Sequence, residues 1–167
     1  MGKPKQEDKL QNNFELRSFY LAFSSASRFI RKSNLDSAEE ILARADSIRK
    51  GFQPQSWNLL QCVRTYFLLM LPQEDAEAYE HNLTKLHETA DVEEQVTLYA
   101  ALPLLPYPSI NSKRAAEGIR TNITDVFDAI ALDNPYPADF LNELSLESNG
   151  FKSCFYATTF VPYLSCR

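Results

Sequence analysis

Apolar residues recur every three or four positions from Leu16 to Ile130, and this spacing constrains the fold more than any other feature of the chain. A helix brings residues three and four apart onto one face, whereas a half-buried strand alternates apolar and polar residues. No alternating run of any length occurs before Ser145. The sequence therefore predicts an all-α fold, arranged as an antiparallel helical bundle or as a short, repeat-like helical array.

The apolar pattern divides into helices at caps, prolines and glycines. The predicted helices span about residues 16–32, 37–50, 57–71, 74–89 and 91–102, followed by a longer one from Ser112 to Leu132. The third helix is apolar on more than one side, which predicts that it is the central helix. We expect one buried cluster to contain Trp57, Leu60, Phe67, Ile119, Val126 and Phe127.

Length and charge limit the class of protein. With 167 residues the chain can bury a sizeable core as one domain. Its 17 basic and 22 acidic residues give a net charge of -5, which does not favour nucleic acid or an anionic membrane surface. No apolar run approaches the roughly 20 residues of a membrane span. We expect residues 1–13 to be disordered, because that segment is polar. We also expect a cytoplasmic protein, because the same segment lacks the apolar region of a signal peptide.

Residues that could hold a metal or a cofactor are sparse. Cys62, Cys154 and Cys166 are too scattered for a zinc site, and Cys62 is expected to be a buried thiol. His81 and His87 lie six positions apart on a charged helix, which does not match HExxH, and both are expected to be solvated. Only 4 glycines are present, too few to suggest a phosphate-binding loop. The sequence therefore predicts neither a metal nor a cofactor.

The predicted helix from Ser112 to Leu132 carries a polar face opposite its apolar stripe. That face comprises Arg114, Glu117, Thr121, Asp125 and Asp128, flanked by Arg120 and Asn122. One interpretation is a solvated face with incidental ion pairs, each worth about 0.5 kcal/mol or less. The other is a polar groove in which Glu117, Arg120, Asn122 and Asp128 meet a ligand or a partner.

Proline-rich turns bound this helix on both sides. The turn Leu105–Pro108 is rigid, because each proline fixes its own backbone and restricts the residue before it. At the other end, the run from Asn134 to Pro137 stops the helix and directs Tyr136 against its last turn. Such a contact is more often packing than binding.

Two stretches carry a resemblance to a known family. Leu98–Pro108 reads LYAALPLLPYP, and Ala115–Phe140 reads AAEGIRTNITDVFDAIALDNPYPADF. Both resemble the EboA family of bacterial metabolite traffic proteins. The resemblance implies a small helical domain, here residues 14–145, encoded beside a prenyltransferase-like membrane enzyme and hydrolase-like and sugar-phosphate-isomerase-like proteins. It further implies a role in moving a secondary-metabolite precursor toward the periplasm, with no established catalytic activity.

Three functions are consistent with this sequence. The leading hypothesis is a non-enzymatic binding or adaptor protein whose partners are the other proteins of the gene cluster and a small secondary metabolite. The alternatives are an enzyme acting on the transported precursor and a purely structural helical scaffold. A deep pocket with a desolvated carboxylate would favour the enzyme, and a shallow exposed surface the adaptor. The candidate binding residues are Arg114, Glu117, Arg120, Asn122, Asp128, Asn134 and Tyr136.

After Ser145 the chain departs from the family pattern, which continues with residues such as WNQMVLKA. One legal coding of Leu146–Leu164, read from its second base, translates to WNQMVLKAVFMQRPLYRI, the expected continuation. A single-base insertion near the junction explains both readings, and the alternative is a genuinely divergent terminus. We therefore expect residues 146–167 to be an out-of-frame, poorly ordered tail.

Sequencing the coding DNA across the Ser145–Leu146 junction tests this explanation. We expect an inserted base there, and its deletion should raise the soluble yield and the melting temperature, because an unselected apolar tail promotes aggregation. A coding sequence that has no possible insertion would contradict the frameshift.

Overall fold

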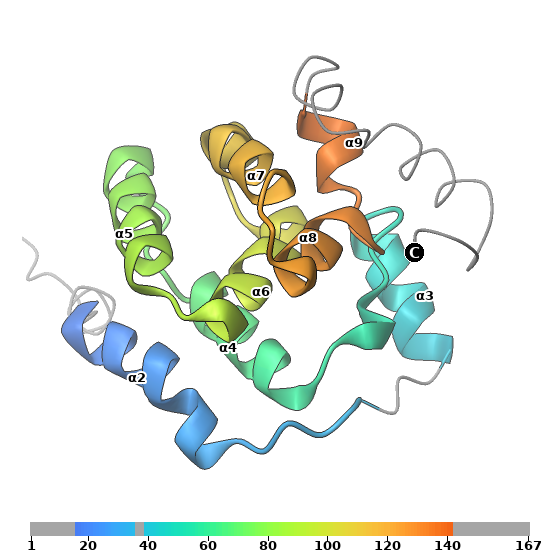
Figure 1. The fold of residues 1–167 in the computed structure, drawn as a ribbon, viewed down its shortest axis with the longest axis horizontal. Helices are drawn as coiled ribbons and strands as arrows, with labels where there is room; N and C mark the ends of the chain where they lie inside the picture. Colours follow the sequence, from blue (N-terminus) through green and yellow to red (C-terminus); the bar gives the residue numbers. More distant parts are fainter. Residues whose placement is uncertain (1–15, 36–38, 142–167) are drawn as a thin grey trace, which may run out of the picture.

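Helices build the part of the chain that the structure describes, a computed structural model covering residues 16–35 and 39–141 (Figure 1). They are α2 (Leu16–Phe29), α3 (Glu39–Ile48), α4 (Leu59–Leu69), α5 (Ala76–Thr89), α6 (Val92–Ala100), α7 (Ser112–Ile119), α8 (Thr124–Ala131) and α9 (Tyr136–Phe140). Short 3-10 turns lie at η1 (Pro54–Ser56), η2 (Leu102–Leu104) and η3 (Pro108–Asn111). The predicted all-α fold is confirmed, as an array of short helices. The predicted disordered segment 1–13 and the predicted tail 146–167 lie outside the described residues.

Within those ranges the polypeptide makes no sheet, and its one strand-like contact is an isolated antiparallel bridge between Asn34 and Asn58. Every helix of the described part falls short of the length and apolarity needed to cross a bilayer.

Side-chain caps fix where several helices begin. Asn58 accepts a hydrogen bond from the backbone of Gln61 at 3.0 Å, and the Gln61 side chain accepts one from the backbone of Asn58 at 2.9 Å. Asp91 and Glu94 form the same reciprocal box at the start of α6. Asp75 caps α5 by accepting from two backbone N–H groups. Each cap satisfies donors that a helix leaves unpaired, and is worth about 1 kcal/mol.

The central helix is α6 rather than α4, so the prediction from apolar content is wrong. Figure 1 shows α6 between α4 and α8, and five of its residues are buried (Glu94, Thr97, Leu98, Tyr99 and Ala100). In α4 the outward side chains of Tyr66 and Leu69 are 62% and 41% exposed. The apolar residues of α4 lie on several sides of the helix, but its neighbours α2 and α6 cover only part of its surface. Composition therefore overestimated its burial.

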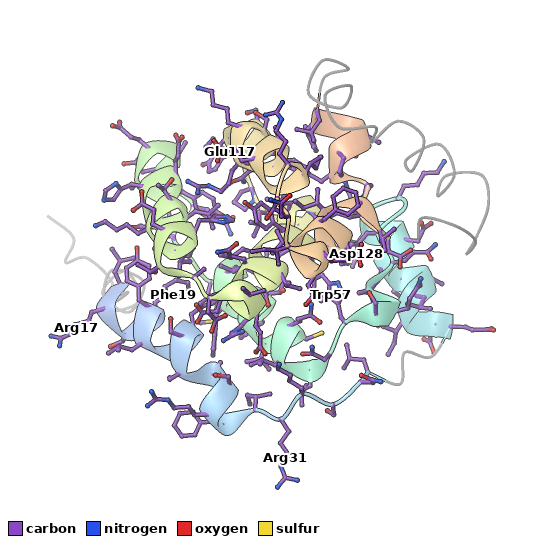
Figure 2. All side chains as sticks on the ribbon, in the orientation of Figure 1. Arg17, Phe19, Arg31, Trp57, Glu117 and Asp128 are labelled. Atoms are coloured by element: carbon purple, nitrogen blue, oxygen red, sulfur yellow. The ribbon has the colours of Figure 1, made fainter. Side chains whose placement is uncertain are left out.

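The core is divided into a main cluster, which contains Phe19, and a smaller one, which contains Trp57 (both labelled in Figure 2). Ile119 and Val126 belong to the main cluster with Phe19, and Phe67 and Phe127 are half-buried against it. Leu60 is buried as predicted, but it belongs to neither cluster. Trp57 instead packs in the smaller cluster with Phe52 and Ala100, so the prediction of a single cluster is wrong for this residue.

The helix predicted from Ser112 to Leu132 is two helices, α7 and α8. The break lies at residues 120–123, where the Thr121 hydroxyl accepts a hydrogen bond from the Ile123 N–H at 3.2 Å. Thr and Asn side chains compete in this way with the backbone bonds of a helix. The break lets α8 pack against both α6 and α7.

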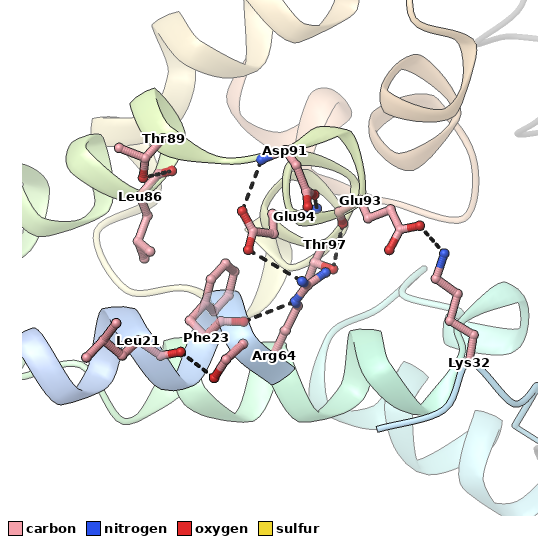
Figure 3. A network of polar contacts seen from close by, with 11 residues as sticks. Leu21, Phe23, Lys32, Arg64, Leu86, Thr89, Asp91, Glu93, Glu94 and Thr97 are labelled. Carbon is pink, nitrogen blue, oxygen red and sulfur yellow. Dashed lines mark hydrogen bonds and ion pairs between the residues drawn. The ribbon is translucent and has the colours of Figure 1, made fainter. Parts of the chain in front are cut away.

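A buried ion pair joins α4 to α6 (Figure 3). Arg64 Nη2 lies 3.4 Å from Glu94 Oε1, and the two side chains are 1% and 6% exposed. Arg64 Nε donates to the carbonyl oxygen of Phe23 in α2 at 3.3 Å, and the guanidinium lies over the Phe23 ring. The other Glu94 oxygen accepts from the backbone N–H of Asp91 at 3.0 Å. One guanidinium thus connects three helices.

Truncating this arginine should destabilise the fold strongly. We expect Arg64→Ala to lower the free energy of unfolding by about 3–5 kcal/mol, because it leaves the Glu94 carboxylate buried without its partner. The exposed Lys32–Glu93 pair provides the control, and Lys32→Ala should cost less than about 1 kcal/mol. Urea denaturation measures both losses. Equal losses for the two variants would contradict a structural role of the buried pair.

Candidate functional site

The turn between α7 and α8 places three of the predicted site residues on the surface. Glu117, Arg120 and Asn122 are all exposed, on the last turn of α7 and in the turn that follows. Asp128 is half-buried on α8, and Figure 2 shows it well apart from Glu117. The break in the helix therefore separates Asp128 from Glu117, which sequence spacing placed on the same continuous face.

Asn134 and Tyr136 hold the fold together around α8 and α9. The Asn134 side-chain amide donates to the carbonyl oxygens of Tyr99 at 3.2 Å and Ala129 at 2.9 Å, and its oxygen accepts from the Tyr136 N–H at 3.0 Å. Tyr136 is fully buried, and its hydroxyl donates to the carbonyl oxygen of Pro108. Burial raises the pKa of this hydroxyl to about 12. These contacts favour packing over ligand binding for both residues.

Asp133, which precedes Asn134, has an unusual backbone conformation and a perturbed carboxyl group. Its φ is 55°, in the left-handed region that non-glycine residues rarely adopt. Burial raises the pKa of the carboxyl group, and a 3.0 Å hydrogen bond from Gln55 Nε2 opposes that shift. The Asp133 carbonyl oxygen also accepts from the Gln53 N–H at 3.2 Å. These two hydrogen bonds attach the segment around η1 to the turn between α8 and α9.

Arg114 belongs to a second polar group, between α5 and α7. Its side chain is half-buried, and Nη2 donates to the Thr84 hydroxyl of α5 at 3.2 Å. Nearby on α5, His87 is 8% exposed, and its ring centroid lies 5.2 Å from that of Tyr99 on α6. The prediction that His87 is solvated is therefore wrong, whereas His81 is exposed as expected.

Burial and the Arg114 charge control the ionisation of this group. Burial, reinforced by the positive charge of Arg114, lowers the pKa of His87 to about 3. The imidazole is therefore neutral at pH 7. Burial raises the pKa of Tyr99, while the nearby Arg114 lowers it and Glu117 raises it. Arg114 and Glu117, predicted from the sequence, thus lie close to two aromatic residues that sequence reasoning did not select.

Gly118 allows the close approach on which this group depends. A Cβ at this position would lie 2.8 Å from the Tyr99 ring, closer than carbon atoms pack. The absence of a side chain lets α7 sit directly against Tyr99. His87 could have been found from the sequence, because it lies four positions after Leu83 on the buried stripe of α5.

A metal centre has no support in the described ranges, where no three His, Cys, Asp or Glu side chains gather to hold an ion. Cys62, expected to be buried, is half-buried beside the smaller core cluster. The group around Arg114 instead offers a cation and hydrogen-bonding partners, which suit recognition of a polar ligand.

Comparison with protein families decides the assignment. The family model described as metabolite traffic protein EboA matches residues 3–161. The chain belongs to the EboA family. Comparisons with curated proteins and with solved structures find no match. The EboA match extends beyond both boundaries predicted for the domain, residues 14 and 145, and runs into the segment predicted to be out of frame. The domain boundaries and the frameshift stay predictions.

The buried histidine predicts how the stability of this EboA-family protein depends on pH. Below about pH 6.5 the unfolded chain protonates His87, whereas the folded chain does not until the pH nears about 3. The free energy of unfolding should therefore fall as the pH drops from about 6.5, by about 2 kcal/mol at pH ~5.

Urea denaturation at a series of pH values measures this slope. His87→Leu should remove most of it, and His81→Gln, which changes an exposed histidine, should leave it in place. The same slope in the unmodified protein and in His87→Leu would show that His87 is not responsible.

Proposed function

We propose that this EboA-family chain is a non-enzymatic binding or adaptor protein of a bacterial metabolite traffic system. The observation that carries the proposal is the exposed polar surface at the α7–α8 turn, formed by Glu117, Arg120 and Asn122. The sequence of this turn is part of the stretch that resembles the family, and a rigid array of helices presents it to the solvent. An exposed surface of mixed charge suits reversible contact with a partner.

The geometry favours binding over acid–base catalysis by the same residues. A catalytic acid or base usually has a pKa that an enclosed site has shifted toward neutrality. Glu117 is instead exposed, and Asp128 lies on α8, well apart from Glu117 of α7 (Figure 2). The catalytic use of Glu117, Arg120 and Asp128 considered from the sequence would need Glu117 and Asp128 to converge.

The partners that we propose are the other proteins of the gene cluster, with a prenyltransferase-like membrane enzyme, hydrolase-like proteins and isomerase-like proteins among them. A small secondary metabolite is the second proposed ligand. The cytoplasmic location expected from the sequence also stays a prediction. A scaffold that only holds partner proteins together would use the same exposed surface, but it would not respond to the metabolite.

Substitutions at the turn test this role. We expect Arg120→Ala and Asn122→Ala to reduce both the capture of the cluster's other products in a pull-down and metabolite export. The melting temperature should change little in the two exposed variants, because surface truncations usually cost under about 0.5 kcal/mol.

Arg44→Ala is the matched control, since Arg44 is exposed on α3, away from this turn. It should leave capture and export unchanged. Capture that survives in both turn variants would contradict the proposed surface. A large fall in stability would show instead that the residues support the fold.

A further inference from the structure

Arg114 is a half-buried cation that lacks a counter-charge in the described part of the chain. Its guanidinium makes one hydrogen bond, to Thr84, and no described carboxylate lies within ion-pair distance of it. The chain as a whole carries 22 acidic residues against 17 basic ones. An arginine that is partly removed from water is stabilised when a carboxylate or a bound anion lies beside it. Although acidic residues outnumber basic ones, none of the described carboxylates neutralises Arg114, which leaves its charge available to a bound anion.

Next to Arg114 is a buried polar atom with no hydrogen-bond partner among the described residues. The Nε2 atom of His87 is shielded from solvent and unpaired, and the residue is 8% exposed. Because a buried polar group without a partner is costly, native structures rarely keep one without a reason. The positive charge of Arg114 acts on this imidazole. An anionic ligand would satisfy both groups at once.

Two further polar groups lie along the same helices. The Tyr79 hydroxyl of α5 and the Asn111 side-chain nitrogen, directly before α7, are buried and have no hydrogen-bond partner in the described ranges. Tyr79 packs beside Tyr107, whose backbone has a φ of 52°. Thr84 and His87 of α5 and Arg114 of α7 form what we call the seam between α5 and α7, and further unpaired hydrogen-bonding groups lie near the N-terminal ends of both helices.

The charges around His87 define what the seam can accept. Arg114 of α7 and Tyr99 of α6 lie closest to it, and Glu117 of α7 acts on Tyr99. Thr84 also lines an open depression on α5, together with Asp75, Glu77, Glu80 and His81. These carboxylates disfavour an anion in proportion to its charge, so a singly charged carboxylate or monoanionic phosphate suits the site better than a dianion.

We propose that the seam between α5 and α7 binds an anionic oxygen group, a carboxylate or a phosphate, with Arg114 as its counter-charge and Thr84 and His87 as hydrogen-bonding partners. The inference rests on the binding role proposed above, and it names the chemistry of the ligand. Planar guanidinium groups recognise carboxylate and phosphate oxygens in the same bidentate manner, so both ligands share one mode of binding.

Nuclear magnetic resonance of the full chain tests the site. In the His81→Gln background His87 is the one histidine of the chain, so its imidazole resonance is unambiguous. We expect inorganic phosphate or acetate to shift this resonance at mildly acidic pH, because a bound anion favours the protonated imidazole. Chloride at equal ionic strength should not. A shift with phosphate alone identifies a phosphate site, and a shift with acetate identifies a carboxylate site.

Variants separate this site from general salt effects. Arg114→Gln should weaken the anion-dependent shift by about tenfold or more, whereas Arg17→Gln, on the exposed side of α2, should leave it unchanged. If Arg114→Gln does not fold, Thr84→Val removes a proposed hydrogen-bonding partner and should also weaken the shift. No shift with either anion, or equal shifts in the Arg114 and Arg17 variants, would overturn the inference. Partner capture through the α7–α8 turn would survive that result, so the two proposals fail separately.

Discussion

The buried contact between Arg64 and Glu94 is the interaction on which the arrangement of the other helices depends. It brings α4 and α6 together, and the same guanidinium reaches the backbone of α2 through Phe23. A carboxylate and a guanidinium are costly to bury unless their hydrogen-bonding capacity is used, and here a helix cap uses the second oxygen of Glu94. The pair therefore permits few alternative positions of α6.

The position of α6 in turn determines where the polar groups of the surface lie. Tyr99 of α6 packs against His87 on one side and beneath Gly118 on the other. Its carbonyl oxygen accepts a hydrogen bond from Asn134, which holds the α8–α9 turn. Tyr99 thus contacts His87 in the seam around Arg114 and also Gly118 of α7, the helix that leads into the exposed turn at Glu117, Arg120 and Asn122. A binding surface on such a support needs little rearrangement to meet a partner.

Sequence reasoning located part of the candidate site and misjudged the rest for identifiable reasons. Glu117, Arg120 and Asn122 are exposed, as a polar face should be. Asp128 was grouped with them because a continuous helix was assumed, but Thr121 interrupts it by bonding to the backbone nearby. Asn134 and Tyr136 are polar residues of the kind that suggests binding, yet each is occupied within the fold. His87 was expected to be solvated because its helix is highly charged, but it lies on the buried stripe of that helix.

The spacing of apolar residues alone determined that this chain is helical, because that spacing reflects the local geometry of one helix at a time. The two stretches Leu98–Pro108 and Ala115–Phe140 likewise sufficed to indicate the EboA family. Which helix is central, and which polar residues are buried, depended on contacts between segments distant in the chain. Arg64 shows the reason: its burial requires Glu94, thirty positions away, and no local pattern records that pairing. Only the tertiary structure decided it.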